Sequence, residues 1–289
     1  MAYINDSGKF TANSLTLSSL NETDLIAASG AAAISTGGSD KTSLGIAGSF
    51  SKNVLVGKTK SYIIGATITE THALTLTAKR TGDIFALTAG GALVPDKKGI
   101  AIAGSVSLNK IQNETETFLD EVKATVKRSV PLNGDIFLSA MDTSEMLVIA
   151  GSLSYGGKIG IGASVALNKN YNTTKATIKG STLEHDGGLT LWAINDNEIT
   201  SAAAGIAASK DTLGASGAVS LNFIDNLVEA SIVNSTNRVD PNHISGSIFL
   251  LAKDDSLIQS LAGAVGASKK IGIGGALAYN SIENTITAF

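Results

Sequence analysis

The sequence predicts an all-β protein folded as a single β-solenoid, and two observations support that prediction. The first is a self-similar block that returns about every 57 residues. Its clearest segment is a glycine-rich apolar run that ends in asparagine, and it reads GIAGSFSKN, IAIAGSVSLN, IGIGASVALN, LGASGAVSLN and IGIGGALAYN. A fixed period in this range is typical of solenoids and repeat arrays, in which one supersecondary unit is used many times.

The second observation is strand-like alternation within each block. Residues 74–78, 189–193 and 174–178 alternate apolar and polar positions and are rich in β-branched side chains. Helix is the competing interpretation for the alanine-rich segments. It fails because these segments are only about ten residues long and contain glycine, which costs roughly 1 kcal/mol per position in a helix. Only residues 116–127 are compatible with a short helical insertion.

The repeats extend over the whole chain, so residues 1–289 form one solenoid region. Five blocks are expected at residues 14–69, 73–128, 134–183, 187–239 and 245–289. A block of this length divides into three coils of roughly 19 residues, which would advance the axis by about 14 Å per block. The alternative architecture is a meander of long antiparallel hairpins, because each small-residue segment meets a turn and then a similar segment.

Composition excludes several classes of function. The formal net charge is −3, and the longest basic cluster, residues 123–128, holds only three basic side chains, so no nucleic-acid partner is expected. The chain has no cysteine, which excludes disulfides and thiolate metal sites. Aromatic residues make up only 5% of the chain, so the apolar volume comes from aliphatic side chains.

Neither end of the chain shows an obvious cap. A bare solenoid end exposes unpaired strand edges, which favour aggregation. We therefore expect the sequence to be a fragment of a longer polypeptide, with further repeats as neighbours. The first residues show no basic segment followed by an apolar one, as a signal peptide would require.

Recurrent asparagines are the best-supported special positions. Asparagine tolerates left-handed turns and bonds its own backbone, so these residues are expected to mark repeated structural corners, about 14 Å from their equivalents. One set ends the apolar segment and the other follows it by four residues in the later blocks. The positions are Asn53, Asn109, Asn168, Asn222 and Asn280, then Asn113, Asn172, Asn226 and Asn284.

No catalytic residue, cofactor or metal ligand is expected. The histidines His72, His185 and His243 lie in different blocks, too far apart on the three-coil arrangement to share a metal ion. Acidic clusters at Asp254-Asp255 and at residues 196–198 would be the candidates for polysaccharide cleavage, but they occupy equivalent variable segments rather than one unique site. The glycine runs lack the residues of a phosphate-binding loop.

Two segments, GIGASVALNKNYNTTKATIKGSTL and GIAIAGSVSLNKIQNETE, together with the recurring LTLxA pattern, resemble the repeats of large leukotoxin-type filamentous adhesins of fusobacteria. The resemblance extends from about Ser14 to Phe289. It implies a right-handed parallel β-helix, exported by a two-partner or autotransporter-like route and displayed on the bacterial surface or secreted. The secretion domain of such proteins is absent here, and no catalytic residues carry over.

Three functional hypotheses follow from these observations. The first is a non-enzymatic structural or adhesive segment of a surface adhesin or leukotoxin, a rigid rod that presents a binding surface to a host-cell receptor or glycan. The second is a membrane-active, cytolytic toxin repeat region. The third is a polysaccharide-active β-helix enzyme. The first predicts no turnover, the second leakage of membranes, and the third a product from a glycan.

Overall fold

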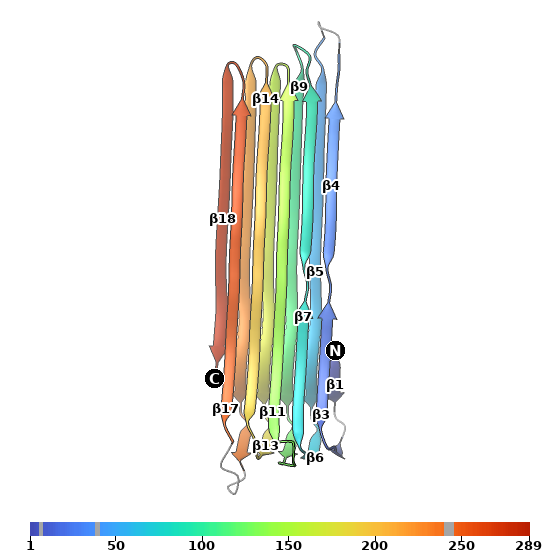
Figure 1. The fold of residues 1–289 in the computed structure, drawn as a ribbon, viewed down its shortest axis with the longest axis vertical. Coiled ribbons are helices and arrows are strands. Elements are labelled where there is room, and N and C mark those ends of the chain that lie inside the picture. The colour runs from blue at the N-terminus through green and yellow to red at the C-terminus, as the bar shows by residue number, and fades with distance from the viewer. Residues whose placement is uncertain (6–7, 38–40, 240–245) are drawn as a thin grey trace.

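The computed structural model describes residues 1–5, 8–37, 41–239 and 246–289. All regular secondary structure in these ranges is β-strand, arranged in three sheets whose neighbouring strands run parallel. The expected all-β parallel solenoid is therefore confirmed. The two long sheets stand face to face, and a short sheet closes the coil at one end (Figure 1).

The front sheet, nearest the viewer in Figure 1, holds the strands that run upward. In order across the sheet they are β17 (Ile248–Ala267), β14 (Leu189–Ser209), β11 (Asp135–Gly156), the collinear pair β7 (Ala73–Thr81) and β8 (Ile84–Val94), and the pair β3 (Leu15–Glu22) and β4 (Leu25–Ile34).

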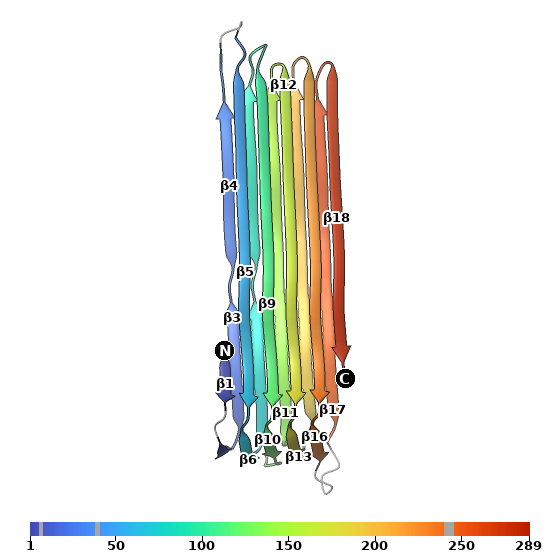
Figure 2. The ribbon, with the colours of Figure 1, turned by 180° about the vertical axis from the view of Figure 1, so that it is seen from behind.

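The back sheet carries the strands that run downward, as Figure 2 shows. Its order is β1 (Ala2–Asn5), β5 (Leu44–Ile64), β9 (Ile100–Asp120), β12 (Ile159–Lys179), β15 (Leu213–Val233) and β18 (Ile271–Ala288). The base sheet is made of β16 (Thr236–Val239), β13 (Thr182–His185), β10 (Lys123–Val126), β6 (Thr67–Thr71) and β2 (Lys9–Thr11).

The chain therefore climbs the front sheet, turns at the tip, descends the back sheet and returns along the base. Each circuit advances it from the N-terminal toward the C-terminal side, leftward in Figure 1. Seen along the direction of advance this path is clockwise, so the coil is right-handed.

One block forms one coil, not three. Ile159 of β12 pairs with Ile100 on one side and Leu213 on the other, and each of these is a whole block away. The three-coil subdivision was wrong because the glycine and polar positions within a block are not turns. They continue strands of about 21 residues. A block therefore advances the axis by only ~4.8 Å, while the strands span about 70 Å along their length.

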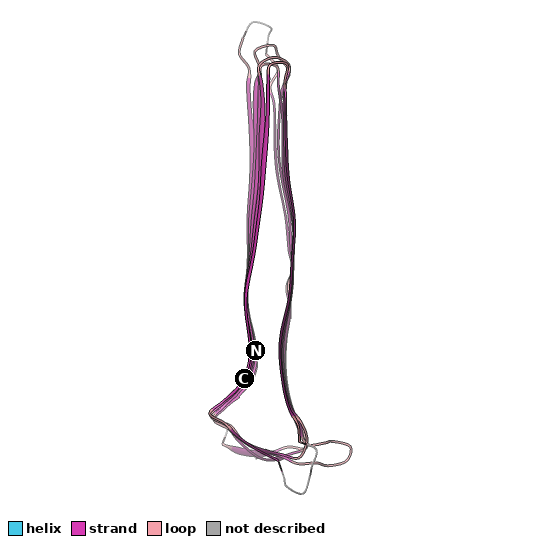
Figure 3. Cartoon of the chain, turned by 90° about the vertical axis from the view of Figure 1, so that its left-hand side faces the viewer, coloured by secondary structure: helices cyan, strands magenta, loops and turns pink. Residues whose placement is uncertain are grey.

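The antiparallel meander is also wrong, although its turns exist. The strands β11 and β12 follow one another around the tip turn, yet they do not pair with each other as neighbouring strands of one sheet. Each pairs in parallel with its equivalents in neighbouring blocks. The two long sheets are therefore layers of one flattened coil, and Figure 3 shows them close together from the tip down to a wider foot.

Residues 116–127 are not helical. Glu116 to Asp120 complete β9, Glu121 takes a left-handed conformation with φ 54°, and Lys123–Val126 form β10 of the base. The alternation of β-branched residues with polar ones in this segment is compatible with both β9 and β10.

The interior is layered along the strands rather than uniform. A lower apolar cluster near the base contains Leu76, Leu138 and Leu191, all fully buried. A second cluster higher up contains Ile84, Ile111 and Met146. Polar side chains separate the two clusters, and small residues fill the interior toward the tip.

Candidate functional site: asparagine ladders and apolar outer faces

The first set of recurrent asparagines forms a continuous ladder inside the coil. Each Nδ2 donates to Oδ1 of the equivalent residue in the next block. The bonds are Asn53 to Asn109 at 2.7 Å, then Asn109 to Asn168, Asn168 to Asn222 and Asn222 to Asn280, each at 2.8 Å. An amide suits this role because it holds a donor and an acceptor in one side chain.

These asparagines do not lie at corners, as the sequence interpretation had it. All five lie within the long back strands, and Asn168 and Asn222 are completely buried. Because one block makes one coil, equivalent asparagines lie on adjacent strands and touch, rather than lying about 14 Å apart.

The second set lies four residues further along and differs in its bonding. Here the backbone N–H of one asparagine donates to Oδ1 of the next: Asn113 to Asn172 at 3.0 Å, Asn172 to Asn226 at 3.1 Å and Asn226 to Asn284 at 3.1 Å. These residues also lie within strands and not at corners. Their Nδ2 groups are left free to donate across the core to the front sheet.

The acceptors on the front sheet complete a polar belt across the interior. Asn172 Nδ2 lies 3.1 Å from Asp142 Oδ1 and 3.0 Å from Ser144 Oγ, and Asn226 Nδ2 lies 3.0 Å from Asp254 Oδ2. The belt separates the two apolar clusters. Its members are Arg80, Asn113, Thr115, Asp142, Ser144, Asn170, Asn172, Asn195, Asn197, Asn226, Asp254, Ser256 and Asn284.

Two charged residues are buried within the belt. Arg80 is 1% exposed and pairs in register with Asp142, which is also 1% exposed. Burial raises the pKa of the Asp142 carboxyl, although Thr115, Asn113 and the charge of Arg80 oppose that rise. Burial likewise lowers the pKa of the Arg80 guanidinium, against the attraction of Asp142.

Gly57 explains why Arg80 fits. Position 57 is equivalent to Asn113 in the next block, but a Cβ on Gly57 would lie 1.6 Å from Arg80 Nη1. The arginine therefore occupies the space of the missing asparagine side chain. Among the described residues, Arg80 Nε and Nη1 and Asn113 Oδ1 have no hydrogen-bond partner, so the second ladder stops at this coil.

Above the second apolar cluster, the interior holds mainly small side chains. Inward positions of the back sheet there are glycine, alanine and serine, such as Gly160, Gly162 and Ser164. The two sheets approach backbone to backbone: a Cβ on Gly90 would lie 2.2 Å from the carbonyl oxygen of Gly104, and one on Gly205 would lie 2.5 Å from that of Gly217. No large apolar side chain would fit between the sheets.

Large aliphatic side chains instead point outward from both sheets of this upper half. Ile46 is 62% exposed on the back sheet, and Ile26 and Leu153 are 80% and 58% exposed on the front sheet. We call these two surfaces the apolar outer faces. The back face consists of Leu44, Ile46, Phe50, Ile100, Ile102, Val106, Leu108, Ile159, Ile161, Val165, Leu167, Leu213, Val219, Leu221, Ile271, Ile273 and Leu277. The front face consists of Ile26, Ile34, Phe85, Leu87, Leu93, Leu147, Ile149, Leu153, Ile206, Leu261 and Val265.

Charged residues border the apolar outer faces above and below. At the lower border of the back face, Lys110 Nζ lies 5.8 Å from the ring centroid of Tyr171, and Lys169 Nζ lies 5.7 Å from that of Phe223. The tip turns are basic and carry Lys41, Lys97, Lys98, Lys158, Lys210, Lys269 and Lys270. Among the tip carboxylates, hydrogen bonds from the Gly37 backbone and the Ser43 hydroxyl lower the pKa of Asp96.

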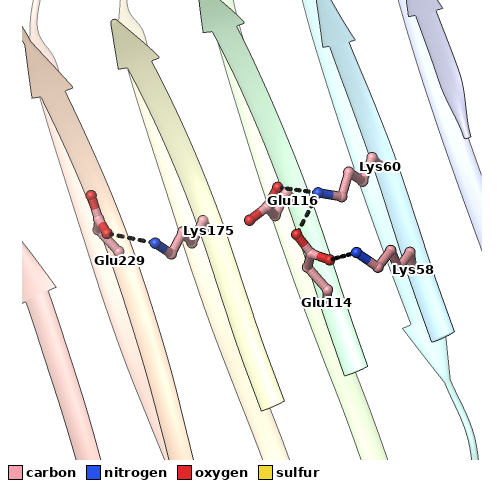
Figure 4. A network of polar contacts seen from close by, with 6 residues as sticks. All are labelled: Lys58, Lys60, Glu114, Glu116, Lys175 and Glu229. Carbon is pink, nitrogen blue, oxygen red and sulfur yellow. Dashed lines mark hydrogen bonds and ion pairs between the residues drawn. The ribbon is translucent and has the colours of Figure 1, made fainter. Parts of the chain in front are cut away.

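Below the back face, the outer surface changes to an ion-pair network (Figure 4). Lys60, Glu116, Lys175 and Glu229 occupy one row across four coils, with alternating charge. Lys60 Nζ lies 2.8 Å from Glu116 and also contacts Glu114, while Lys175 Nζ lies 3.2 Å from Glu229. Partial burial lowers the pKa of Lys60, but its bonds to the two glutamates outweigh this and raise it.

The histidines are separated in the structure. His185 is buried in β13, with Nδ1 2.8 Å from the Gly187 carbonyl, and His72 precedes β7, with Nδ1 2.9 Å from the Lys127 carbonyl. His243 lies outside the described residues. In the part of the chain that the structure describes, no three histidine or acidic side chains gather as a metal site would require.

The acidic clusters are divided by strand alternation. Asp254 points inward and accepts hydrogen bonds from Asn195, Asn226 and Asn284, whereas Asp255 points outward beside Lys253. Within residues 196–198, Asn197 is buried and its two acidic neighbours face the other side of the sheet. Neither cluster alone pairs two carboxylates, but Asp196 and Asp255 from the two clusters lie in register on neighbouring coils and both face outward.

The comparisons with known proteins give no relative. No family model, no curated protein and no solved structure matches this chain. Across the described ranges, no helix is long and apolar enough to cross a bilayer.

The belt and the apolar outer faces were missed from the sequence, although a signal was present. In IGIGASVALN, large residues occupy one phase of the alternation and small or polar residues the other. Without the register, that pattern does not tell which phase faces inward. The usual expectation that large apolar residues are inside gives the opposite answer here.

Proposed function

We propose that this chain is a non-enzymatic structural and adhesive segment of a secreted or surface-displayed bacterial protein, which binds a host-cell partner through its apolar outer faces. The observation that carries the proposal is the inverted upper half, with small residues inside and aliphatic residues outside in all five coils. Monomeric soluble proteins rarely expose contiguous apolar patches beyond a few hundred Å², and larger ones mark interaction sites.

The regular stacking supports this role. Each coil presents the same outward rows, so the faces are flat and repeat every ~4.8 Å. The recurrent polar residues, which would otherwise be candidates for chemistry, are engaged in the ladders and the belt. Their chemistry is used to hold neighbouring coils together.

Binding of labelled protein to host cells tests the proposal. Val106→Lys and Val165→Lys place charges in the middle of the back face without entering the core. We expect either change to reduce cell binding strongly, whereas Thr177→Lys, on the outer surface of β12 near the base, should leave it unchanged. Equal binding by all three variants would contradict the proposal.

A second candidate function, membrane activity, is favoured by the height of the apolar outer faces. From Ile159 to Leu167 the back strand rises about 26 Å, comparable with the ~30 Å hydrocarbon core of a bilayer. Because both outer faces are apolar, they suit insertion with the strands along the bilayer normal, so that lipid contacts both faces. A chain lying flat on the membrane would leave one apolar face in water. Lysines at the lower border and at the tip would reach the two headgroup regions.

Protein-free vesicles separate the two candidates. Membrane activity predicts that the chain floats with vesicles and releases an entrapped dye, and that Val165→Lys abolishes both. The adhesive role predicts no leakage, together with cell binding that is lost when surface proteins and glycans are removed from the cells. A chain that neither releases dye from vesicles nor binds to cells would contradict both the adhesive role and membrane activity.

A further inference from the structure

The open ends of the coil carry complementary halves of the same contacts. We infer that a second copy of this chain stacks head-to-tail on the first, with β17 and β18 of one copy pairing with β3, β4 and β5 of the next. Two independent features of the structure support this joint: the polarity of the asparagine ladder and the interior rows of the end coils.

The first asparagine ladder has a direction, and so it has two different ends. Every bond runs from Nδ2 of one coil to Oδ1 of the next. At the C-terminal end, Asn280 Nδ2 has no acceptor among the described residues. At the N-terminal end, Asn53 Oδ1 has no donor among them. In the stacked joint, Asn280 of one copy donates to Asn53 of the next and continues the ladder unbroken.

The interior rows of the two end coils also match. Leu17 and Leu25 at the N-terminal end are half-buried, and so are Leu250 and Ile258 at the C-terminal end. Following the register through the coils, Leu17 shares a row with Leu250, and Leu25 shares one with Ile258. Between them, Leu76, Leu138 and Leu191 fill the first of these rows and are fully buried. Stacking would bury the end residues in the same way.

The two terminal segments would overlap in a stack, so one of them must leave the edge. Ala2 pairs with Ser61, and tracing that row through the back sheet leads to Ala288. Both termini therefore lie at the same height on the back sheet, as Figures 1 and 2 show. In a stack, Met1–Tyr3 of one copy and Thr287–Phe289 of the other compete for one short stretch of edge. Along the rest of β5 and β18, both edges are unpaired.

The joint is heterologous, because the two surfaces differ. Such a contact does not close on itself unless it bends into a ring, so it produces a series of oligomers rather than one dimer. One row opposes association: Glu22 meets Asp255, and both are acidic and outward-facing. Salt screens this repulsion, so association is expected to strengthen at high ionic strength.

Sedimentation velocity of the full chain over a range of concentrations tests the inference. We expect a ladder of species that grows with concentration and with salt. Asn280→Asp keeps the acceptor for Asn222 but removes the donor to Asn53, so it should weaken the joint about tenfold while leaving the thermal melt unchanged. A chain that stays monomeric at all concentrations, or that stops at a symmetric dimer, would overturn the inference.

Cysteine pairing gives a second readout, independent of the strength of association. The chain has no cysteine, so Asn53→Cys and Asn280→Cys introduce single thiols. Mixing the two variants should give a disulfide-linked heterodimer, whereas either variant alone should not crosslink to itself. Crosslinking of each variant to itself would show a different contact. Val165→Lys should leave the crosslink intact, which distinguishes this joint from association through the apolar outer faces.

Discussion

Asn109 donates a hydrogen bond of 2.8 Å from Nδ2 to Oδ1 of Asn168, although 59 residues separate them in the chain. That single distance establishes that one block makes one coil. It also shows how the coils are kept in register, because a shift of one residue would remove each amide from its neighbour and turn it toward solvent.

The ladder predicts a position-dependent cost for removing an amide. Asn168→Ala deletes two buried hydrogen bonds and leaves Asn222 Oδ1 without its donor, so we expect a loss of about 2–4 kcal/mol in the free energy of unfolding. Asn280→Ala, at the open end, deletes one half-exposed bond and should cost about 1 kcal/mol. Urea denaturation measures both, and equal costs would contradict the ladder's role.

The narrow upper half predicts that two glycines on the neighbouring front strands β11 and β14 respond in opposite ways. Gly205→Ala places a Cβ 2.5 Å from the Gly217 carbonyl oxygen and should destabilise by about 1–3 kcal/mol. Gly151→Ala, on the outer face with open space around it, should be neutral or stabilise by up to about 1 kcal/mol. Comparing their melting temperatures with that of the parent chain tests the close approach of the two sheets.

The buried carboxyl of Asp142 predicts a pH effect of unusual sign. Its pKa is raised in the folded chain, so the folded state holds the proton more tightly than the unfolded state does. Stability from this group is present at low pH and falls as pH rises from 3.8 through the raised pKa. Asp142→Asn removes this pH-dependent loss of folding stability. The variant should therefore gain stability relative to the parent as pH rises from 3.8 through the raised pKa of Asp142.

Asp211 provides the matched control for that experiment. It is exposed in a tip turn, and Lys270 lowers its pKa below 3.8. Its contribution is present above 3.8 and is lost as pH falls through the lowered value. Asp211→Asn should therefore lose stability relative to the parent as pH rises from the lowered pKa to 3.8, and should differ from the parent by a constant amount above 3.8, where Asp142→Asn gains stability. Parallel pH profiles for the two variants would contradict the burial of Asp142.

The ion-pair row predicts salt-sensitive stability on the lower back face. Lys60→Met removes contacts to Glu114 and Glu116 from a side chain that is 18% exposed, and should cost about 0.5–1.5 kcal/mol at low salt. The difference should shrink at high salt because the charges are screened. Lys58→Met, at a side chain 60% exposed, should change stability by less than about 0.5 kcal/mol. A cost for Lys60→Met that is independent of salt would point to packing instead.

The sequence predicted the all-β solenoid because the period and the alternation survive in every block. It did not predict the coil length, because IGIGASVALN carries glycines that are equally common in turns and in closely packed strands. The recurrence of Asn168 and its equivalents was visible, but their contact depends on which blocks are adjacent. The partnership of Gly57 with Arg80 was hidden, since it joins opposite sheets in neighbouring coils.

The coincidence of block and coil has a consequence for how such a chain changes length. Gain or loss of a whole block, such as that from β11 to β13, would restore every row with a neighbouring equivalent and alter the stack by one layer of ~4.8 Å. A single-residue insertion within β12 would instead exchange the inside and outside of the strand beyond it. Duplication and deletion by complete blocks is therefore the tolerated route to a longer or shorter homologue, and small insertions belong in the tip and base turns.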